Sequence, residues 1–464
     1  MMYCFKKLVL GIAPTRRDSF PPPAGAQKVK AEATPKLMEI FGKIHDLEIV
    51  DIESVNSEGM VYSYDDVPKI VELFKSKGVD AVFFPHYNFG QEEPVAMIAK
   101  AMGVPALLWG PRDECPPDPD VSRNRQTDIQ CGLFATTKAF ISYKVPFTYI
   151  ENCWLDSPVL AKGIEDFVRA ASAVKAFRNT RVLQLSVRPR QFLSVKVSES
   201  ELLAKFGIEV IPVESAEIIR TIKYVLDEKK SEVSAVVAEW KKDYNIVNNT
   251  DEELTNMAGL ALGVLEMASK YKCNVAAGEC WSLIRSTFGV SCCFVWGWLT
   301  GKGLPVACET DIHGSITSSL LMGAVRGEVD TFLADITIRH PSNDNAELFW
   351  HCGPFPKSLA RAGARTNIKD GKGFYELEHC DYTICRFDQA EGCYSIFLGE
   401  GKGVEGPKTD GNYVWVEVSD WVAWEKKLMY GPYIHHSVCT QGRFKEVLTE
   451  ACKYIPGLCA DPID

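Results

Sequence analysis

The chain has 464 residues, of which 46% are hydrophobic and 24% are charged, and its formal net charge is −10. A chain of this length is too long for one hydrophobic core and should fold as several domains. Nucleic-acid-binding proteins usually carry basic surfaces, so the acidic balance argues against a nucleic-acid partner. The apolar runs are shorter than a membrane span, and we expect no membrane partner either.

Strand-like and helix-like segments alternate through the first part of the chain. Strand patterns cover residues 8–12, 47–52, 81–85, 105–109 and 146–150, with helical patterns between them at 26–44, 65–77, 92–102 and 127–143. This alternation is typical of a doubly wound parallel sheet of the Rossmann or flavodoxin-like kind. We place this N-terminal domain at residues 1–155. The loop that carries Arg16 and Arg17 then lies at the carboxyl edge of the sheet, where ligands bind.

A second doubly wound α/β domain is predicted for residues 156–345. Helical patterns at 160–177, 199–206 and 216–226 alternate with strands at 181–186 and 208–212, and one long helical stretch covers 233–272. From residue 346 to 464, short alternating runs separated by Gly and turn residues indicate a β-rich, barrel-like domain. The expected fold class is α/β, with two parallel-sheet domains followed by this β-rich domain.

Two acidic residues stand at the ends of apolar, strand-like runs of the central domain. Glu309 follows the run 304–308, and Asp335 follows the run 331–334. If the two runs are neighbouring parallel strands, both carboxylates meet at one edge of the sheet. Carboxylates that lie together repel one another unless a cation stands between them, which suggests a divalent metal site. The alternative is that each acid caps a following helix, which is common after a strand.

Histidines follow the same region. His351 lies in the segment WHCG (350–353), and His435 and His436 are adjacent in the β-rich domain. A histidine bonded to backbone in a core explains His351 equally simply. Neighbouring residues on a strand point to opposite faces, so at most one of the pair is expected to join a given site directly.

The sixteen cysteines contain no CxxC pair, which argues against zinc-ribbon and thioredoxin sites. Scattered cysteines in a large chain without a secretory signal are usually reduced core residues. We therefore expect a cytoplasmic location.

These motifs resemble the L-fucose isomerase and L-arabinose isomerase superfamily, especially its shorter fucose-isomerase-like branch. The resemblance is carried by VACETDIHG (306–314), LAD (333–335), WHCG (350–353) and the pair His435-His436. It covers roughly residues 280–440, while the N-terminal part agrees only in architecture.

The resemblance implies a metal-dependent aldose–ketose isomerase that acts on a free monosaccharide through an enediol. Its metal ligands fall on Glu309, Asp335 and His436, with the two acids also moving the protons. The implied metal is Mn²⁺, with Co²⁺ or Mg²⁺ as alternatives. His435 falls near the sugar. His351 falls near a further metal-binding histidine of the arabinose branch that the fucose branch lacks, and we assign it to substrate binding.

Family members are usually hexamers in which a neighbour's N-terminal domain completes the pocket. By this analogy Arg16 and Arg17 contact the far end of the sugar, which is of the fucose or arabinose type or a related sugar, anionic sugars included. Two other functions fit the same residues: a metal-dependent sugar-acid aldolase or lyase, and a catalytically silent sugar-binding protein on the same scaffold.

Overall fold

The computed structural model describes residues 7–18, 23–113 and 127–463. They form two compact units, one ending at Ser172 and the other beginning at Ala173. The limits of the three predicted domains, at residues 155 and 345, stay a prediction.

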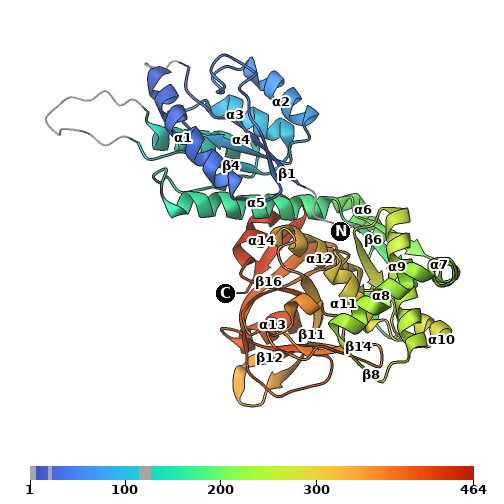
Figure 1. Cartoon of the computed structure of the whole chain (residues 1–464). Coiled ribbons are helices and arrows are strands. Elements are labelled where there is room, and N and C mark those ends of the chain that lie inside the picture. The colour runs from blue at the N-terminus through green and yellow to red at the C-terminus, as the bar shows by residue number, and fades with distance from the viewer. Residues whose placement is uncertain (1–6, 19–22, 114–126, 464) are drawn as a thin grey trace. The chain divides into compact units, whose positions relative to one another are not determined.

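The N-terminal unit (blue to cyan in Figure 1) is built on a parallel sheet with strand order β2-β1-β3-β4-β5. Its strands are β1 Leu8–Ile12, β2 Leu47–Val50, β3 Ala81–Pro85, β4 Ala106–Trp109 and β5 Thr148–Tyr149, and its helices are α1 Pro23–Gly42, α2 Asp66–Ser76, α3 Glu92–Met102, α4 Ile129–Tyr143 and α5 Pro158–Arg178, the last of which continues into the second unit. Neighbouring residues of β3 enter different cores, because Phe83 packs in one hydrophobic cluster and Val82 and Phe84 in another. A sheet that is buried on both faces is the predicted doubly wound arrangement, which is confirmed.

The second unit contains a smaller parallel sheet with strand order β10-β9-β6-β7. Its strands are β6 Arg181–Leu185, β7 Glu209–Val213, β9 Val275–Gly278 and β10 Val306–Cys308, and its helices are α6 Glu199–Phe206, α7 Ser215–Glu228, α8 Lys230–Asp243, α9 Asp251–Tyr271, α10 Leu283–Phe288, α11 Cys293–Gly301 and α12 Ile312–Val325. Its core includes Trp240 and Trp296.

The single helix predicted over 233–272 is wrong. Helix α8 ends at Asp243, and the chain then forms the short strand β8 Asn245–Val247. Helix α9 starts with a capping box in which Thr250 and Glu253 satisfy each other's backbone N–H groups. Such a cap marks the start of a new helix. The hydrophobic periodicity over 233–272 therefore belongs to two successive helices and not to one.

Most of the remaining strands form an antiparallel barrel, drawn in orange and red in Figure 1, while β14 and β19 pair with it in parallel. Strands β16, β15, β18, β11, β12 and β17 pair in that order, and pairing of β16 with β17 closes the ring. The strands are β11 Thr331–His340, β12 Asn343–His351, β13 Asn367–Lys369, β14 Lys372–Glu376, β15 Asp381–Ala390, β16 Cys393–Val404, β17 Asn412–Glu417, β18 His436–Gln441 and β19 Leu458–Pro462, with helices α13 Trp421–Tyr430 and α14 Lys445–Cys452. The predicted barrel-like domain is confirmed.

The expected position of Asp335 needs a correction. Its strand, β11, belongs to the barrel and pairs antiparallel with β12 and β18, whereas β10, which precedes Glu309, belongs to the parallel sheet. The apolar run 331–334 looks the same in either sheet, since both bury it. The two acids therefore come from two different sheets.

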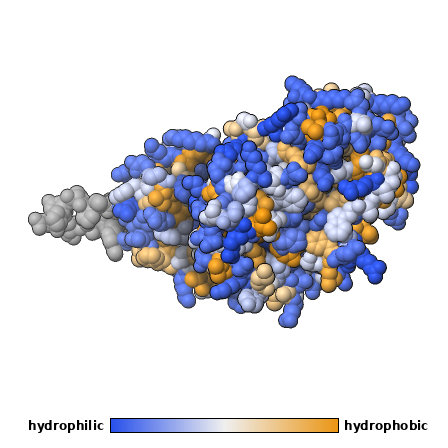
Figure 2. All heavy atoms as spheres, turned by 90° about the horizontal axis from the view of Figure 1, so that it is seen from below, coloured by the Kyte–Doolittle hydropathy of each residue, from blue (hydrophilic) through white to orange (hydrophobic). Residues whose placement is uncertain are grey.

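Hydrophobic residues on the face shown in Figure 2 form small separate groups among hydrophilic ones, which is normal for a folded chain. Among the described residues, none of the helices is long and apolar enough to cross a bilayer.

A buried acid on β12 makes stability depend on pH. Burial raises the pKa of Glu347 to about 7, although Arg339 acts in the opposite direction. Its contribution to folding is fully present below the ordinary glutamate pKa of 4.5 and is lost as the pH rises through about 7. We expect Glu347→Gln to stabilise the protein relative to wild type at pH 8 but not at pH 4.5, by on the order of 2–3 kcal/mol.

Thermal melts of both proteins across this pH range test the prediction. Glu417→Gln, at an exposed acid on the neighbouring strand β17, is the matched control and should show no such trend. A difference between wild type and Glu347→Gln that does not change with pH would contradict it.

Candidate active site

Glu309 is held at a sharp turn between a strand and a helix. Strand β10 ends at Cys308, and Glu309 and Thr310 then have φ angles of 60° and 58°. Two successive non-glycine residues in the left-handed region are unusual and are found mostly where function demands them. Asp311 follows as the N-cap of α12, and its Oδ1 accepts the Gly314 N–H at 3.0 Å. The cap is therefore Asp311, not Glu309.

Asp335 and His436 are neighbours in the barrel. They lie opposite each other in the register of β11 with β18, and cross-strand partners present their side chains together. His436 is fully buried, whereas the Asp335 side chain keeps 19% of its exposure. The barrel thus determines the position of one acid and one imidazole.

The two sheets bring the three predicted metal ligands together. His436 Nε2 lies 3.2 Å from Glu309 Oε2 and 3.2 Å from Asp335 Oδ1. His436 Nε2 and Asp335 Oδ1 are buried and have no hydrogen-bond partner. Such atoms are costly when left unpaired, so the geometry fits a ligand that both contact.

Asp311 orients the imidazole. Its Oδ2 accepts a hydrogen bond from His436 Nδ1 at 2.9 Å and a second one from Arg386 Nη1. Arg386 also donates from Nε to Asp388 Oδ2 at 2.9 Å. Because Nδ1 donates to Asp311, Nε2 is the nitrogen that faces Glu309 and Asp335. This carboxylate–histidine arrangement is typical behind a metal ligand.

Charge pairing keeps these acids ionised in spite of their burial. Burial alone raises the pKa of Asp311, but Arg386 and His436 outweigh it and hold that pKa well below its usual range. For Asp335, His351 and His436 overcome burial and lower the pKa, and for Glu309 it is mainly His436 that lowers the pKa. Burial lowers the pKa of His436, yet the three carboxylates raise it well above the usual value. A site that favours this proton also favours a metal cation in its place.

His351 is arranged as a donor toward Asp335. The Cys352 N–H donates to His351 Nδ1 at 2.9 Å, so Nδ1 must be the acceptor and Nε2 carries the proton. His351 Nε2 lies 4.0 Å from Asp335 Oδ1. In this tautomer His351 cannot ligate a metal through Nε2, which favours the substrate-binding role over the metal-binding one.

Both members of the histidine pair face Asp335, contrary to the expectation that at most one would. His435 Nε2 lies 4.0 Å from Asp335 Oδ1, and Asp335, His435 and His436 could together hold an ion. Strand β18 begins only at His436, so the alternation of a strand does not apply to His435. His435 is half-exposed, as a residue near a substrate would be.

Two aromatic residues border the acids and histidines. Trp281 is 48% exposed, and its Nε1 donates to Glu309 Oε1 at 2.8 Å. The Phe192 ring stacks on His435 with centroids 5.6 Å apart and meets the edge of His436 at 5.1 Å. Trp296 lies in the core, whereas Trp154, like Trp281, is exposed.

The remaining predicted site residues, Arg16 and Arg17, belong to the N-terminal unit. Arg16 is buried and donates to both oxygens of Glu58, at 2.7 and 2.6 Å. Arg17 pairs with Glu92 and lies over the Phe89 ring. Both charges are therefore paired within their own unit, and their role in substrate binding stays a prediction.

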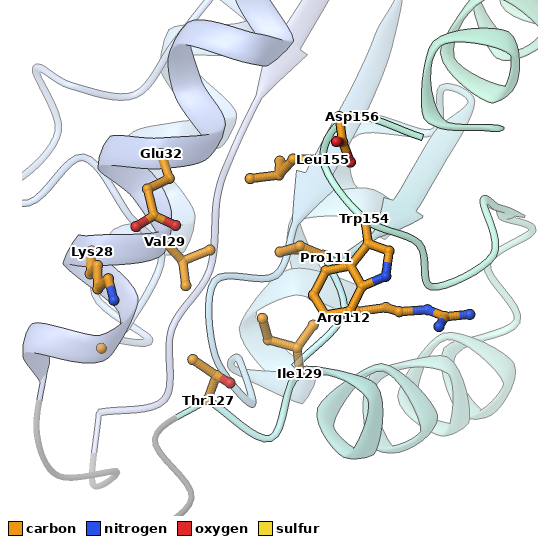
Figure 3. A pocket seen from close by; sticks show the side chains of 11 residues that line it. Lys28, Val29, Glu32, Pro111, Arg112, Thr127, Ile129, Trp154, Leu155 and Asp156 are labelled. Atoms are coloured by element: carbon orange, nitrogen blue, oxygen red, sulfur yellow. The ribbon is translucent and has the colours of Figure 1, made fainter. Parts of the chain in front are cut away.

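The N-terminal unit also has a cavity of about 590 Å³ at the carboxyl edge of its sheet. In Figure 3, Lys28, Val29 and Glu32 on α1 face Pro111, Arg112 and Trp154. The Arg112 guanidinium lies 5.8 Å from the Trp154 ring centre. The cavity lies where doubly wound sheets bind ligands, as expected for this edge.

Sequence reasoning missed Asp311, Arg386, Asp388 and Phe192. Asp311 had a detectable signal, since an Asp before an apolar helix is a typical N-cap. Arg386 and Asp388 lie in a strand-like run with no motif, and no local pattern connects them with residue 311.

Known sugar isomerases are similar to most of this chain. Residues 11–178 match the family described as fucose/sulfoquinovose isomerase, N-terminal domain. The chain is 24% identical over 407 residues to the sulfoquinovose isomerases of Priestia aryabhattai and Priestia megaterium (strain ATCC 12872 / QMB1551), covering 85% of this chain and 88% of each relative. The sulfoquinovose isomerase of Alkalicoccus urumqiensis is 22% identical over 357 residues, covering 75% of this chain and 78% of the relative.

A solved structure that matches is an ABC transporter periplasmic solute binding protein from Actinobacillus succinogenes 130z with bound D-allose. It covers 59% of this chain and 78% of its own, at 11% identity and a TM-score of 0.17, which is too low to carry an argument. The sulfoquinovose isomerase relatives extend over most of the chain, and together with the family match they confirm the predicted resemblance to the fucose-isomerase-like superfamily. Residues 11–178 thus match the N-terminal domain of the fucose/sulfoquinovose isomerase family, and the chain is an isomerase.

Proposed function

We propose that this enzyme is a Mn²⁺-dependent aldose–ketose isomerase whose substrate is a sulfonated aldose of the sulfoquinovose type. The observation that carries the proposal is the convergence of Glu309 and Asp335 on His436 Nε2, each at 3.2 Å. The similarity to sulfoquinovose isomerases supplies the substrate class. The hexameric assembly implied by the resemblance and the cytoplasmic location inferred from the cysteines stay predictions.

The donor set fits a divalent cation. Two carboxylates and one neutral imidazole nitrogen are ligands that Mn²⁺ accepts, with Co²⁺ and Mg²⁺ as alternatives. Glu309, Asp335 and His436 would hold the ion, and Asp311 would fix the imidazole behind it. Such an ion polarises sugar oxygens and stabilises negative charge that develops on them.

The two carboxylates provide the proton transfers. Isomerisation moves a carbonyl group from C1 to C2, so one proton leaves C2 and another is delivered to C1. The lowered pKa values of Glu309 and Asp335 keep both acids ionised at neutral pH, and each can accept a proton. Trp281 holds Glu309 Oε1 through its Nε1–H, which fixes that carboxylate.

Histidine and aromatic side chains are placed to orient the sugar. The Nε2–H of His351 and the half-exposed ring of His435 both face the Asp335 side of the site. A donor directed at a sugar hydroxyl orients the substrate. The exposed Trp281 ring and the Phe192 ring provide apolar surface for the C–H face of a sugar.

The loop that carries Phe192 also carries two arginines. Arg188 Nη1 donates to the carbonyl oxygens of Pro189 and Arg190, at 3.0 and 3.3 Å, and so braces the loop. The Arg190 side chain is exposed, two residues before Phe192. We assign Arg190 to recognition of the sulfonate, because a guanidinium binds such an anion through paired donors.

The substrate assignment predicts turnover that depends on the sulfonate. With Mn²⁺, we expect the protein to convert sulfoquinovose into its ketose and to turn over 6-deoxyglucose, which lacks only the sulfonate, much more slowly. Nuclear magnetic resonance in ²H₂O should show the product ketose and deuterium entering at the carbon that gains a proton. Asp335→Asn should reduce the rate by about 10²-fold or more.

Other products would point to the competing functions. Carbon–carbon cleavage would support the lyase, and sugar binding without product would support the silent sugar-binding protein. Turnover of L-fucose with none of sulfoquinovose would contradict the substrate class but leave the isomerase reaction standing.

Arg190→Ala should separate sulfonate binding from catalysis. Losing a charge-assisted contact of about 1.5–3 kcal/mol corresponds to a KM for sulfoquinovose raised roughly 10–100-fold. The kinetics with 6-deoxyglucose should be nearly unchanged. Arg220→Ala, on α7, is the surface control. An equal rise of KM with both sugars would show that Arg190 does not recognise the sulfonate.

Asp311→Asn should weaken metal binding without removing a ligand. If the amide oxygen stays on Gly314 N–H, the NH₂ group faces His436 Nδ1 and displaces its proton to Nε2. We expect Mn²⁺ affinity to fall about 10–100-fold, as for other groups that orient a ligand. Titration followed by the electron paramagnetic resonance signal of free Mn²⁺ measures this directly.

Asp388→Asn is the matched control for Asp311→Asn. It also removes one carboxylate from Arg386 but does not touch His436. Both variants should lower the melting temperature, whereas only Asp311→Asn should lose Mn²⁺ affinity. Equal affinity losses would indicate that Arg386 and not the imidazole tautomer controls metal binding.

A further inference from the structure

Glu279 is a buried acid beside the proposed active site that the isomerase chemistry above does not use. It directly follows strand β9, is 6% exposed, and its own N–H donates to the Leu185 carbonyl oxygen at 3.2 Å. Strands β9 and β10 are parallel neighbours, and the Thr310 N–H donates to the Gly278 carbonyl oxygen at 3.1 Å. The loop that begins with Glu279 and the turn that carries Glu309 therefore leave the same edge of the sheet side by side.

The Glu279 carboxylate binds the backbone of its own loop. Oε1 accepts the Trp281 N–H at 2.7 Å and the Ser282 N–H at 2.8 Å. Oε2 accepts the Leu283 N–H at 3.0 Å, and the Ser282 hydroxyl donates to Oε1 at 3.3 Å. Burying a carboxylate is costly unless donors of this kind compensate it. The segment 279–283 is thus folded around one buried side chain.

This loop determines where the indole of Trp281 lies. The Trp281 side chain is 48% exposed, so packing alone does not hold it. Its Nε1 donates to Glu309 Oε1 at 2.8 Å, whereas Glu309 Oε2 lies 3.2 Å from His436 Nε2. The two oxygens of Glu309 therefore have different partners. One oxygen is held by the indole, and the other faces the remaining ligands of the proposed ion.

The arrangement exceeds what starting a helix requires. Ser282 precedes α10 and is a residue type that commonly caps a helix with its own side chain, yet it makes no such cap bond. Its hydroxyl donates to Glu279 instead. The acceptor for this turn thus comes from the end of β9, which ties the loop to the sheet edge that carries Glu309.

We propose that Glu279 is a positioning residue of the isomerase, which holds the backbone of Trp281 so that the indole N–H sets the orientation of the Glu309 carboxylate. The inference rests on the proposed function, in which Glu309 holds the ion and moves a proton. A carboxylate with both tasks depends on its orientation, since a misplacement of about 1 Å at a reacting group can cost on the order of 10²-fold in rate. Glu279 acts on Glu309 through Trp281.

A double-mutant cycle on the whole protein tests this connection. Trp281→Phe removes the indole N–H but keeps an aromatic ring, and we expect kcat for sulfoquinovose to fall about 10-fold or more, as for the loss of a hydrogen bond to a charged group. Glu279→Ala should lower kcat by a similar factor. Adding Glu279→Ala to Trp281→Phe should lower kcat little further, because residues that act as a unit are not additive.

A signal from the indole itself does not depend on the sugar. In protein labelled with 5-fluorotryptophan, the fluorine resonance of Trp281 is the one that Trp281→Phe removes. Glu279→Ala should shift this resonance, because the indole loses its fixed place on Glu309. Glu279→Gln should shift it less, since the amide oxygen can still accept the Trp281 and Ser282 N–H groups while its NH₂ group faces the Leu283 N–H.

Glu253→Ala is the matched control in the same unit. Glu253 accepts the Thr250 N–H at 2.8 Å in the capping box of α9, so it also binds backbone at the start of a helix. We expect Glu253→Ala to lower the melting temperature and to leave kcat and the Trp281 resonance unchanged. A carboxylate that only stabilises the fold would give this result at Glu279 too.

Two results would overturn the proposal: additive losses of kcat in the double variant, and a Trp281 resonance that Glu279→Ala does not shift. If Glu279→Ala does not fold, Glu279→Gln takes its place in both measurements and the same two results decide. Wild-type protein that does not turn over sulfoquinovose would contradict the proposed function alone. The Trp281 resonance then still decides whether Glu279 positions the indole.

Discussion

The carboxylate of Asp311 is the interaction on which the site depends. It caps helix α12, accepts a hydrogen bond from His436 Nδ1 and forms an ion pair with the buried Arg386. These partners come from a helix that follows the parallel sheet and from two strands of the barrel. A single buried carboxylate can remain ionised there because each of its contacts is a donor or a cation. Without it, the imidazole would have no fixed tautomer, and the buried charge of Arg386 would be paired with Asp388 alone.

The site therefore belongs to a junction between two sheets and not to either sheet alone. β10 supplies Glu309 through a turn with two left-handed residues, and β11 and β18 supply Asp335 and His436 through their pairing register. A strand pair in register holds its side chains more rigidly than a loop can. The strained turn then brings the second acid to a position that the barrel has already determined. This division explains how residues of different sheets meet at 3.2 Å.

Sequence patterns predicted the parts of this arrangement that are local. Alternating strand and helix periods identified both parallel sheets, and the apolar runs before Glu309 and Asp335 marked the acids as unusual. They could not show that β11 leaves the parallel sheet, because a buried strand has the same composition in both settings. They also joined α8 and α9 across β8, since the hydrophobic period continues on either side.

Long-range pairing was out of reach for the same reason. Arg386 is paired with Asp311 only because the barrel brings β15 beside α12, and no periodicity in a single sequence records that contact. The cysteines are a second case. The absence of CxxC pairs excluded local zinc motifs, but Cys293 still meets Cys352 and Cys280 still meets Cys308 across separate elements. Spacing rules detect sites that one hairpin or helix can build, and this chain builds its sites from whole sheets.

The position of β18 has a consequence for biosynthesis. This strand lies near the C-terminus, yet it inserts between β11 and β15, which emerge from the ribosome much earlier. The barrel wall thus has a gap until the ribosome has finished nearly the whole polypeptide, and the imidazole of His436 arrives with the strand that fills it. Barrels with such distant pairings fold slowly. A nascent or truncated chain that stops before this strand exposes two unpaired edges and can have no catalytic centre, so activity itself reports that the barrel has closed.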